Sequence, residues 1–377
     1  MPGPSVVPVP APPPVTDAVV RSRLRAQHLT HRDGGTPDAV VHRILAVQSQ
    51  DLRGARLALR ARTTGLTGEQ VDAAFADRRL VVAWLNRGTL HLVTGEDFWW
   101  LRPLTNPQLA TSNRRRLEQE GVSPEQARRG IEVVSAAVRE RPTSRDDLRA
   151  LLTEAGVPTQ RQAFVHVLFA ASLEGLLVRG PVLANGEQGF VDPVDWLGPP
   201  PSAPDPEEVL ARLAVRYLAG HAPATAADLA YWAGTTLGTA RRAFTAAGCT
   251  VGDDGLARLP DDADEQDVAA DADDAPDVPA PVLLGPFDPV LHGWPDRSPL
   301  LRGYAGVVTD NGVFKATALV GGHVAGVWTL PAGRATLTTL EPLAGPARAA
   351  LDEDARDVHR YLGLPDRPLV VTTTVPS

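Results

Sequence analysis

Two glutamines, Gln48 and Gln50, stand two residues apart in the stretch AVQSQD (46–51). A carboxamide is a poor acid and a poor base, so any chemistry here must come from hydrogen bonding and geometry. The apolar residues of 41–45 recur at helical spacing, and the next position of that stripe is Gln48. Residues two apart share a face on an extended chain but not on a helix. Both side chains can therefore line one cavity only if the helix ends near Val47 and residues 48–50 are extended or turning.

Spacing alone leaves two interpretations of these glutamines open. A buried carboxamide without partners costs about 1 to 3 kcal/mol, and most buried polar groups are simply paired. The pattern by itself therefore favours a structural role, in which Gln48 is a satisfied core residue. The alternative is a pair of carboxamides that face a shared cavity and act on a ligand.

The composition argues against several classes of chemistry. Cys249 is the only cysteine, which leaves no intramolecular disulfide and no thiolate-rich zinc site. The histidines lack HExxH spacing, and neither a GxxxxGK[ST] loop nor a GxSxG motif occurs. We therefore expect no metal ion and no cofactor. Lys315 is the only lysine, so Schiff-base chemistry would have to use this residue or the terminal amine.

The negative charge of the chain is concentrated in one segment. The formal net charge is -8, but residues 253–277 hold 11 acidic residues and one arginine, a balance of -10. The rest of the chain is therefore near +2, which is compatible with a nucleic-acid partner. Such a block of like charge is typical of a solvated linker.

No membrane or secretion signal is visible in the sequence. No apolar run approaches the roughly 18 residues that a membrane helix needs. Residues 1–15 are rich in proline and have no basic opening, which predicts a disordered, polyproline-like arm and not a signal peptide. We expect a cytoplasmic protein.

The elements that must position these side chains form a repeated pattern. Helical signals from about 16 to 78 precede VVAWLNRGTLHLV (81–93), which predicts a hairpin around residues 86–88. Helices followed by a short hairpin are the winged-helix plan, and the pattern returns over 141–191 and 221–259. Beyond 281, alternating β-branched and small residues predict strands.

The sequence thus predicts an α+β chain of tandem winged-helix units followed by a C-terminal β-rich, barrel-like domain. We expect a Pro-rich arm (1–15), three winged helices (16–95, 96–200 and 205–260), an acidic linker (261–280) and the β-rich domain (281–377).

Winged helices most often bind DNA, and several arginine-rich stretches could contact phosphates. Each stretch alone is more typical of a solvated helix face. The candidates for DNA contact are Arg53, Arg56, Arg87, His91, Arg114 and Arg115. Further polar residues on the predicted hairpin and in the β-rich domain could form a binding pocket or simply occupy turns; these are Asn86, Thr89, Asp288 and His292.

Several motifs, taken in their order along the chain, carry a family resemblance. They are AVQSQD (46–51), AWLNRGTLHLV (83–93), the tryptophan pair at 99–100, LLGPFDPVLHGWPDR (283–297) and NGVFKATALVGGHVAGVW (311–328). Together they resemble the AlkZ branch of the AlkZ/YcaQ family of winged-helix DNA glycosylases, over about residues 17–375. The resemblance implies a C-shaped array of winged helices with a β-domain.

The resemblance also implies the roles of the two glutamines. The catalytic motif of that family is Gln, an apolar residue, then Gln or Asp, and Gln48 and Gln50 fall on the two catalytic positions. Ser49 departs from the apolar middle position, and Asn86 stands where an apolar residue, often Met, is common. The implied activity is hydrolysis of the N-glycosidic bond of cationic alkylated purines in double-stranded DNA by a monomer. The branch includes enzymes that unhook bulky adducts and interstrand cross-links, as in self-resistance to DNA-alkylating natural products.

Two rival readings differ from this activity. A non-catalytic winged-helix regulator would bind a specific DNA sequence and release no base, although no clear dimerisation heptad supports it. A glycosylase scaffold that has lost activity would bind damaged DNA only.

Overall fold

The computed structural model describes residues 15–32, 35–105, 107–202, 205–259 and 278–374. The proline-rich arm, except for Val15, and the linker up to residue 277 lie outside these ranges. Within them, no helix combines the length and the apolar character that spanning a membrane requires.

The first group of elements follows the predicted order of helices and hairpin. Helices α1 (Asp17–Ala26), α2 (Pro37–Ile44), α3 (Leu52–Ala61) and α4 (Gly68–Ala76) precede strands β2 (Leu80–Leu85) and β3 (Thr89–Thr94). Threonine side chains cap α1, α2 and α4 by accepting backbone N–H groups, as helix starts prefer. The predicted hairpin around residues 86–88 is confirmed, with a short 3-10 turn, η1 (Asn86–Gly88), between its strands.

The second group adds its hairpin to the first sheet. Helices α5 (Gly95–Thr105), α6 (Pro107–Gln119), α7 (Pro124–Glu140), α8 (Arg145–Glu154) and α9 (Ala163–Leu173) precede β4 (Val178–Val182) and β5 (Gln188–Val191). The short α10 (Pro193–Leu197) follows. Strand β4 pairs with β2, and the two-residue β1 (Val47–Gln48) pairs with β3, so five strands form one sheet in the order β1-β3-β2-β4-β5. The hairpins of the first two groups therefore share a sheet.

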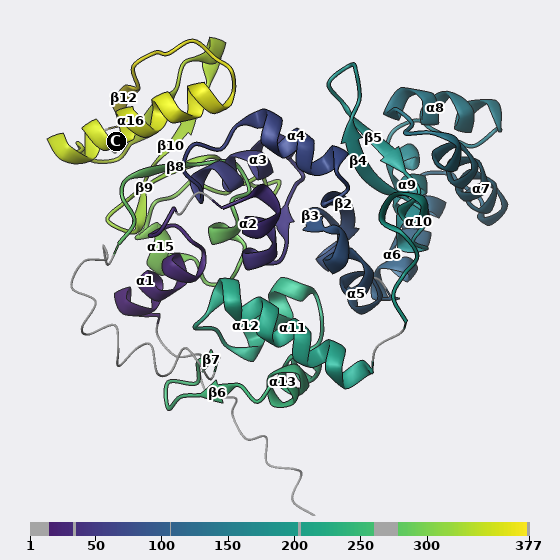
Figure 1. Ribbon diagram of the computed structural model, residues 1–377, viewed down its shortest axis with the longest axis horizontal. Coiled ribbons are helices and arrows are strands. Elements are labelled where there is room, and N and C mark those ends of the chain that lie inside the picture. The colour runs from purple at the N-terminus through teal and green to yellow at the C-terminus, as the bar shows by residue number, and fades with distance from the viewer. Residues whose placement is uncertain (1–14, 33–34, 106, 203–204, 260–277, 375–377) are drawn as a thin grey trace, which may run out of the picture.

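The third group is smaller. Helices α11 (Pro206–His221), α12 (Ala226–Ala233) and α13 (Leu237–Ala246) precede a separate two-stranded hairpin of β6 (Thr250–Val251) and β7 (Ala257–Arg258). Helix α11 packs against α1 and α2, which brings this group back to the first one (Figure 1).

The C-terminal part is a second sheet of five strands. Strands β8 (Val282–Leu284), β9 (Thr317–Val320), β10 (His323–Thr329), β11 (Thr336–Thr339) and β12 (Val370–Thr373) lie in the order β12-β11-β10-β9-β8. Short helical segments, η2 (Pro289–Leu291), α15 (Ser298–Leu301) and η3 (Pro331–Gly333), lie between them.

The expected barrel-like closure is wrong. A barrel requires the two edge strands to pair, but β8 pairs with β9 alone and β12 with β11 alone in the described chain. Helices α3 and α16 (Gly345–Tyr361) pack against β8 instead, and α16 was not predicted from the sequence. The sheet is therefore open and covered by helices (Figure 1).

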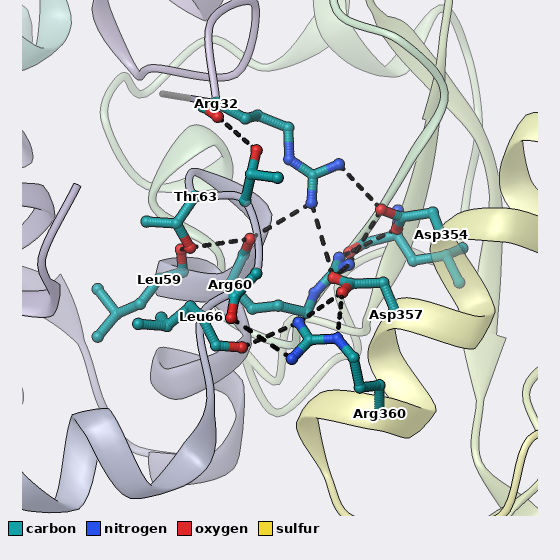
Figure 2. Close-up of polar contacts among 11 residues, drawn as sticks. Arg32, Leu59, Arg60, Thr63, Leu66, Asp354, Asp357 and Arg360 are labelled. Carbon is teal, nitrogen blue, oxygen red and sulfur yellow. Dashed lines mark hydrogen bonds and ion pairs between the residues drawn. The ribbon is translucent and has the colours of Figure 1, made fainter. Parts of the chain in front are cut away.

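A buried ion cluster joins α3 to α16 (Figure 2). The Arg60 guanidinium, 1% exposed, donates to both carboxylate oxygens of Asp354 at 3.0 Å and to Asp357 at 3.0 Å. Arg60 also donates to the carbonyl of Leu283 in β8, at 2.7 Å. Arg32 donates to Asp354 as well. These charges are compensated where they are buried, so the N-terminal helix α3 is fixed to the C-terminal part of the chain.

Candidate active site

Gln48 lies on an extended segment, and Gln50 follows it in a bend of the chain. Helix α2 ends at Ile44, because Leu45 turns the chain with a φ of 68°. Strand β1 (Val47–Gln48) then pairs with β3, and the Ser49 amide donates to the carbonyl of Leu90 at 2.8 Å. Asp51 ends the segment as the N-cap of α3, accepting from the Gly54 amide at 3.1 Å.

The two glutamine side chains differ in exposure. Gln48 is 7% exposed, and its buried amide oxygen accepts no hydrogen bond from another described residue. Gln50 is exposed. An unpaired buried acceptor costs free energy, which makes this oxygen available to a ligand or water.

His91 is the cross-strand partner of Gln48. Its ring is 3% exposed, and Nδ1 lies 2.9 Å from the carbonyl oxygen of Thr89. A carbonyl can only accept, so Nδ1 holds the proton and Nε2 presents a lone pair. Burial lowers the pKa of His91 to about 4; the bond to Thr89 opposes this, and the charge of Arg87 adds to it. The imidazole is therefore neutral near pH 7.

The turn between β2 and β3 supplies more polar groups. Asn86 is fully buried, and neither atom of its carboxamide has a partner among the described residues. The Thr89 hydroxyl is likewise buried without one. Arg87, at a φ of 41°, lies over the Tyr231 ring at 4.4 Å and donates to its carbonyl at 3.2 Å. This contact places helix α12 beside the turn.

An aromatic group surrounds His292. Its ring lies 4.0 Å from the ring of Phe314 and 5.8 Å, nearly parallel, from that of Phe287. The Arg297 guanidinium lies 5.1 Å from the Phe314 ring and donates to the Tyr231 hydroxyl at 2.6 Å. His292 is 6% exposed, and its Nε2 has no partner in the described chain.

Electrostatic coupling connects His292 to the hairpin. Burial lowers the pKa of His292 well below its ordinary value, and the nearby Arg87, Arg297 and His91 lower it further. The structure thus brings residues of the hairpin and of the C-terminal part close enough to affect one another. The two imidazoles and the two arginines thus lie near one another, and one of them, His91, is the cross-strand partner of Gln48.

Asp288, by contrast, is engaged in the core. Its carboxylate is fully buried and binds both terminal nitrogens of Arg62, at 2.9 and 3.0 Å. The same carboxylate caps η2 through the Val290 amide. Gln27 accepts from Arg62 and donates to the carbonyl of Gly220. These contacts hold the turn that presents His292.

A close backbone approach positions this turn against α3. A Cβ atom added at Gly54 would lie 2.3 Å from the carbonyl oxygen of Pro286, and one at Gly285 would lie 2.7 Å from that of Gly54. Only glycine allows such spacing. The backbone of α3 is therefore packed tightly against residues 285–286, which precede the turn that presents His292.

The arginines expected to contact DNA are not all equally available. Arg53, Arg114 and Arg115 are exposed. Arg56 donates to Asp72 at 2.6 Å and to the carbonyl of Gly68. Arg114 lines a groove of about 740 Å³ between α6, α7 and α9, away from the glutamines.

Arg297, Tyr231 and Phe314 were not selected from the sequence. Arg297 ends the motif LLGPFDPVLHGWPDR, which would have been a reason to consider it. No sequence motif indicates Tyr231, because only the packing of α12 against η1 brings this residue to the site. No group of histidine, cysteine or acidic side chains in the described ranges is arranged to hold a metal ion.

Comparisons with known proteins agree with this arrangement. A curated protein of Streptomyces sahachiroi, named interstrand DNA cross-link repair glycosylase, is 28% identical over 219 residues, which is 56% of this chain and 58% of that protein. The solved structure of Streptomyces sahachiroi DNA glycosylase AlkZ superposes with a TM-score of 0.76 at 24% identity, covering 94% of this chain and 98% of that one. The family model described as DNA glycosylase AlkZ-like matches residues 41–361. The resemblance read from the motifs is thus confirmed, and the chain belongs to the AlkZ-like DNA glycosylase family.

Proposed function

We propose that the protein is a monofunctional DNA glycosylase that hydrolyses the N-glycosidic bond of cationic alkylated purines, of the N7-alkylguanine type. The observation that best supports this is the unpaired, buried acceptor of Gln48, which lies two residues before the exposed Gln50. Membership of the family supports the reaction class.

The chemistry suits two carboxamides. Alkylation at guanine N7 or adenine N3 makes the base a cation, which leaves without a general acid. The protein then has to hold a water near the anomeric carbon while an oxocarbenium-like state develops. Gln48 and Gln50 can do so by accepting and donating hydrogen bonds.

The surrounding residues would bind the damaged duplex. We propose that Asn86, Thr89 and His292 line the pocket for the lesion, with Asp288 holding the turn behind it. The exposed Arg53, Arg114 and Arg115 would contact phosphates, and Arg87 would lie near the lesion. The helix-and-hairpin groups would act as winged helices arranged in a C shape around DNA, in a monomer.

The name of the curated relative suggests a more specific substrate. That protein is named for repair of interstrand cross-links. We propose that this protein also removes bulky adducts or unhooks cross-links, which would protect a cell exposed to a DNA-alkylating natural product.

The direct test is release of base from a duplex containing N7-methylguanine, followed by heat or alkali and gel analysis. We expect abasic sites at the lesion only. Absence of release from this and every other cationic purine lesion tried would falsify the proposal. Sequence-specific binding without release would instead favour a regulator.

A further inference from the structure

The proposed hydrolysis needs an acceptor for one proton. As water bonds to the anomeric carbon, the electron pair of the breaking C–N bond neutralises the cationic purine. The water oxygen must then lose a proton. A carboxamide does not take up a proton at neutral pH, so Gln48 and Gln50 can hold the water but cannot deprotonate it.

The carboxylates that adjoin the glutamines and the His292 turn are already engaged. Asp51 accepts from the Gly54 amide as the cap of α3. Asp288 is fully buried against Arg62. Neither can leave its partner without a cost in stability, because α3 would lose its cap and the buried Arg62 its counter-ion.

His91 is placed to receive the proton. The bond from the Ser49 amide to the Leu90 carbonyl identifies Gln48 and His91 as a non-hydrogen-bonded antiparallel pair. In such pairs the Cα atoms are about 4.5 Å apart and both side chains leave the same face of the sheet. The imidazole therefore lies directly beside the carboxamide that holds the water.

The tautomer of His91 has the required form. Nδ1 donates to the Thr89 carbonyl at 2.9 Å, so Nε2 is the acceptor atom. Nε2 forms no hydrogen bond with any residue that the structure describes. We propose that His91 is a catalytic residue whose Nε2 takes the proton of the attacking water and releases it to solvent after the base has left. This inference rests on the proposed glycosylase function, and it gives His91 a role other than the DNA contact expected from the sequence.

The electrostatic surroundings fit this role. Arg87 approaches from η1 and His292 from the turn after η2, while the facing residues of β1 and β2 are the uncharged Gln48 and Ala83. The pKa of His91, lowered to about 4 by burial, is close to that of an ordinary carboxylate. His91 would thus supply the basicity of the Asp found in the other form of the family motif.

The test uses the full chain and duplex DNA with N7-methylguanine under single-turnover conditions. We expect His91→Gln to lower the excision rate constant about 100-fold, within the usual range for general base catalysis, with DNA affinity unchanged within about twofold. The matched control is His323→Gln in β10, whose ring contacts the carbonyl of Pro299 and should leave the rate unchanged. In His91→Ala, added imidazole should restore part of the rate, which a purely structural residue would not allow.

A measurement on the wild-type protein keeps the inference testable even if both His91 variants fail to fold. Proton transfer in the slow step predicts a solvent deuterium isotope effect of about 2 on the single-turnover rate. An isotope effect of one, or a folded His91→Gln with the wild-type rate, would overturn the role of His91. If the wild-type protein releases no base at all, the proposed function itself fails.

Discussion

At the scale of single residues, the decisive feature is the state of the Gln48 carboxamide. A structural glutamine at this position would be paired, as buried polar groups nearly always are. Its amide oxygen is buried and accepts nothing from the described chain, and the Asn86 carboxamide likewise neither donates nor accepts a hydrogen bond there. The unpaired polar atoms on this hairpin and its neighbouring strand support the proposed ligand site.

Removal of either glutamine should separate catalysis from binding. We expect Gln48→Ala and Gln50→Ala each to lower the excision rate about 100-fold, since each removes one hydrogen bond to the attacking water. Affinity for the duplex should stay within about twofold, because neither side chain contacts phosphate in the proposed complex. Single-turnover assays and fluorescence anisotropy measure the two quantities. Full excision by both variants would show that the site lies elsewhere.

At the scale of elements, the hairpin could be predicted and the pairing that completes the site could not. Residues 81–93 contain β-favouring residues around Asn86-Arg87-Gly88, and the observed strands match. Strand β1 is only two residues long, and its role depends on the distant β3. Helix α16 was missed, although Leu351, Ala355 and Val358 repeat at helical spacing. The β-favouring pattern beyond residue 281 led to a prediction of strands throughout this region, so the helical spacing was overlooked.

The contact between α3 and the 285–286 backbone is a second element-scale feature that no local pattern reveals. We expect Gly54→Ala to destabilise the fold by about 1 to 3 kcal/mol and to lower excision, because its Cβ would lie 2.3 Å from the Pro286 carbonyl oxygen. Urea unfolding measures the first effect and single-turnover kinetics the second.

Gly238→Ala is the matched control, since Gly238 also lies in the first turn of a helix. Its added Cβ would meet only the Thr236 hydroxyl, at 3.8 Å. Alanine there should leave excision unchanged and stabilise α13 by up to about 1 kcal/mol. If the two substitutions changed the free energy of unfolding and the excision rate equally, the contact between Gly54 and Pro286 would not position the site.

At the scale of the whole molecule, the site is assembled from both ends of the chain. The ion cluster of Arg60 and Asp354 and the pair of Arg62 and Asp288 connect residues more than 200 positions apart. The sequence indicated which motifs belong together only through the family resemblance. The periodicity of the sequence alone could not have indicated this grouping, because long-range ion pairs produce no local periodicity.

The buried histidines make the stability of the whole fold sensitive to pH. The folded-state pKa of His91 is about 4 and that of His221 about 3, both below the ordinary 6.5. The unfolded chain therefore binds protons first as the pH falls below about 6.5, and the folded state loses stability. We expect the free energy of unfolding to be lower at pH 5.5 than at pH 7.5 by about 1.4 kcal/mol for each such histidine. Urea unfolding of His91→Gln at both pH values should show a difference smaller by that amount, and an unchanged difference would contradict the assignment.

After the base has left, the abasic strand could be cleaved only if an amine of the protein reached the sugar. Strand cleavage by β-elimination usually begins with an amine attacking the sugar as a Schiff base. Lys315 lies closer to the site than the sequence suggested, because it follows Phe314, whose ring contacts His292. Phe314 is buried and Lys315 exposed, and successive side chains of an extended segment point to opposite faces. The ammonium group should therefore face away from the abasic sugar.

We accordingly expect the product strand to stay intact until alkali is added, and borohydride to trap no covalent complex. Lys315→Ala should excise at the wild-type rate, which a gel with and without alkali measures on the same sample. The opposite result would be a trapped complex that disappears in Lys315→Ala. Such a complex would make the amine the nucleophile and move the reacting centre to the segment beside Phe314. Without it, a water held by Gln48 and Gln50 remains the nucleophile that the geometry supports.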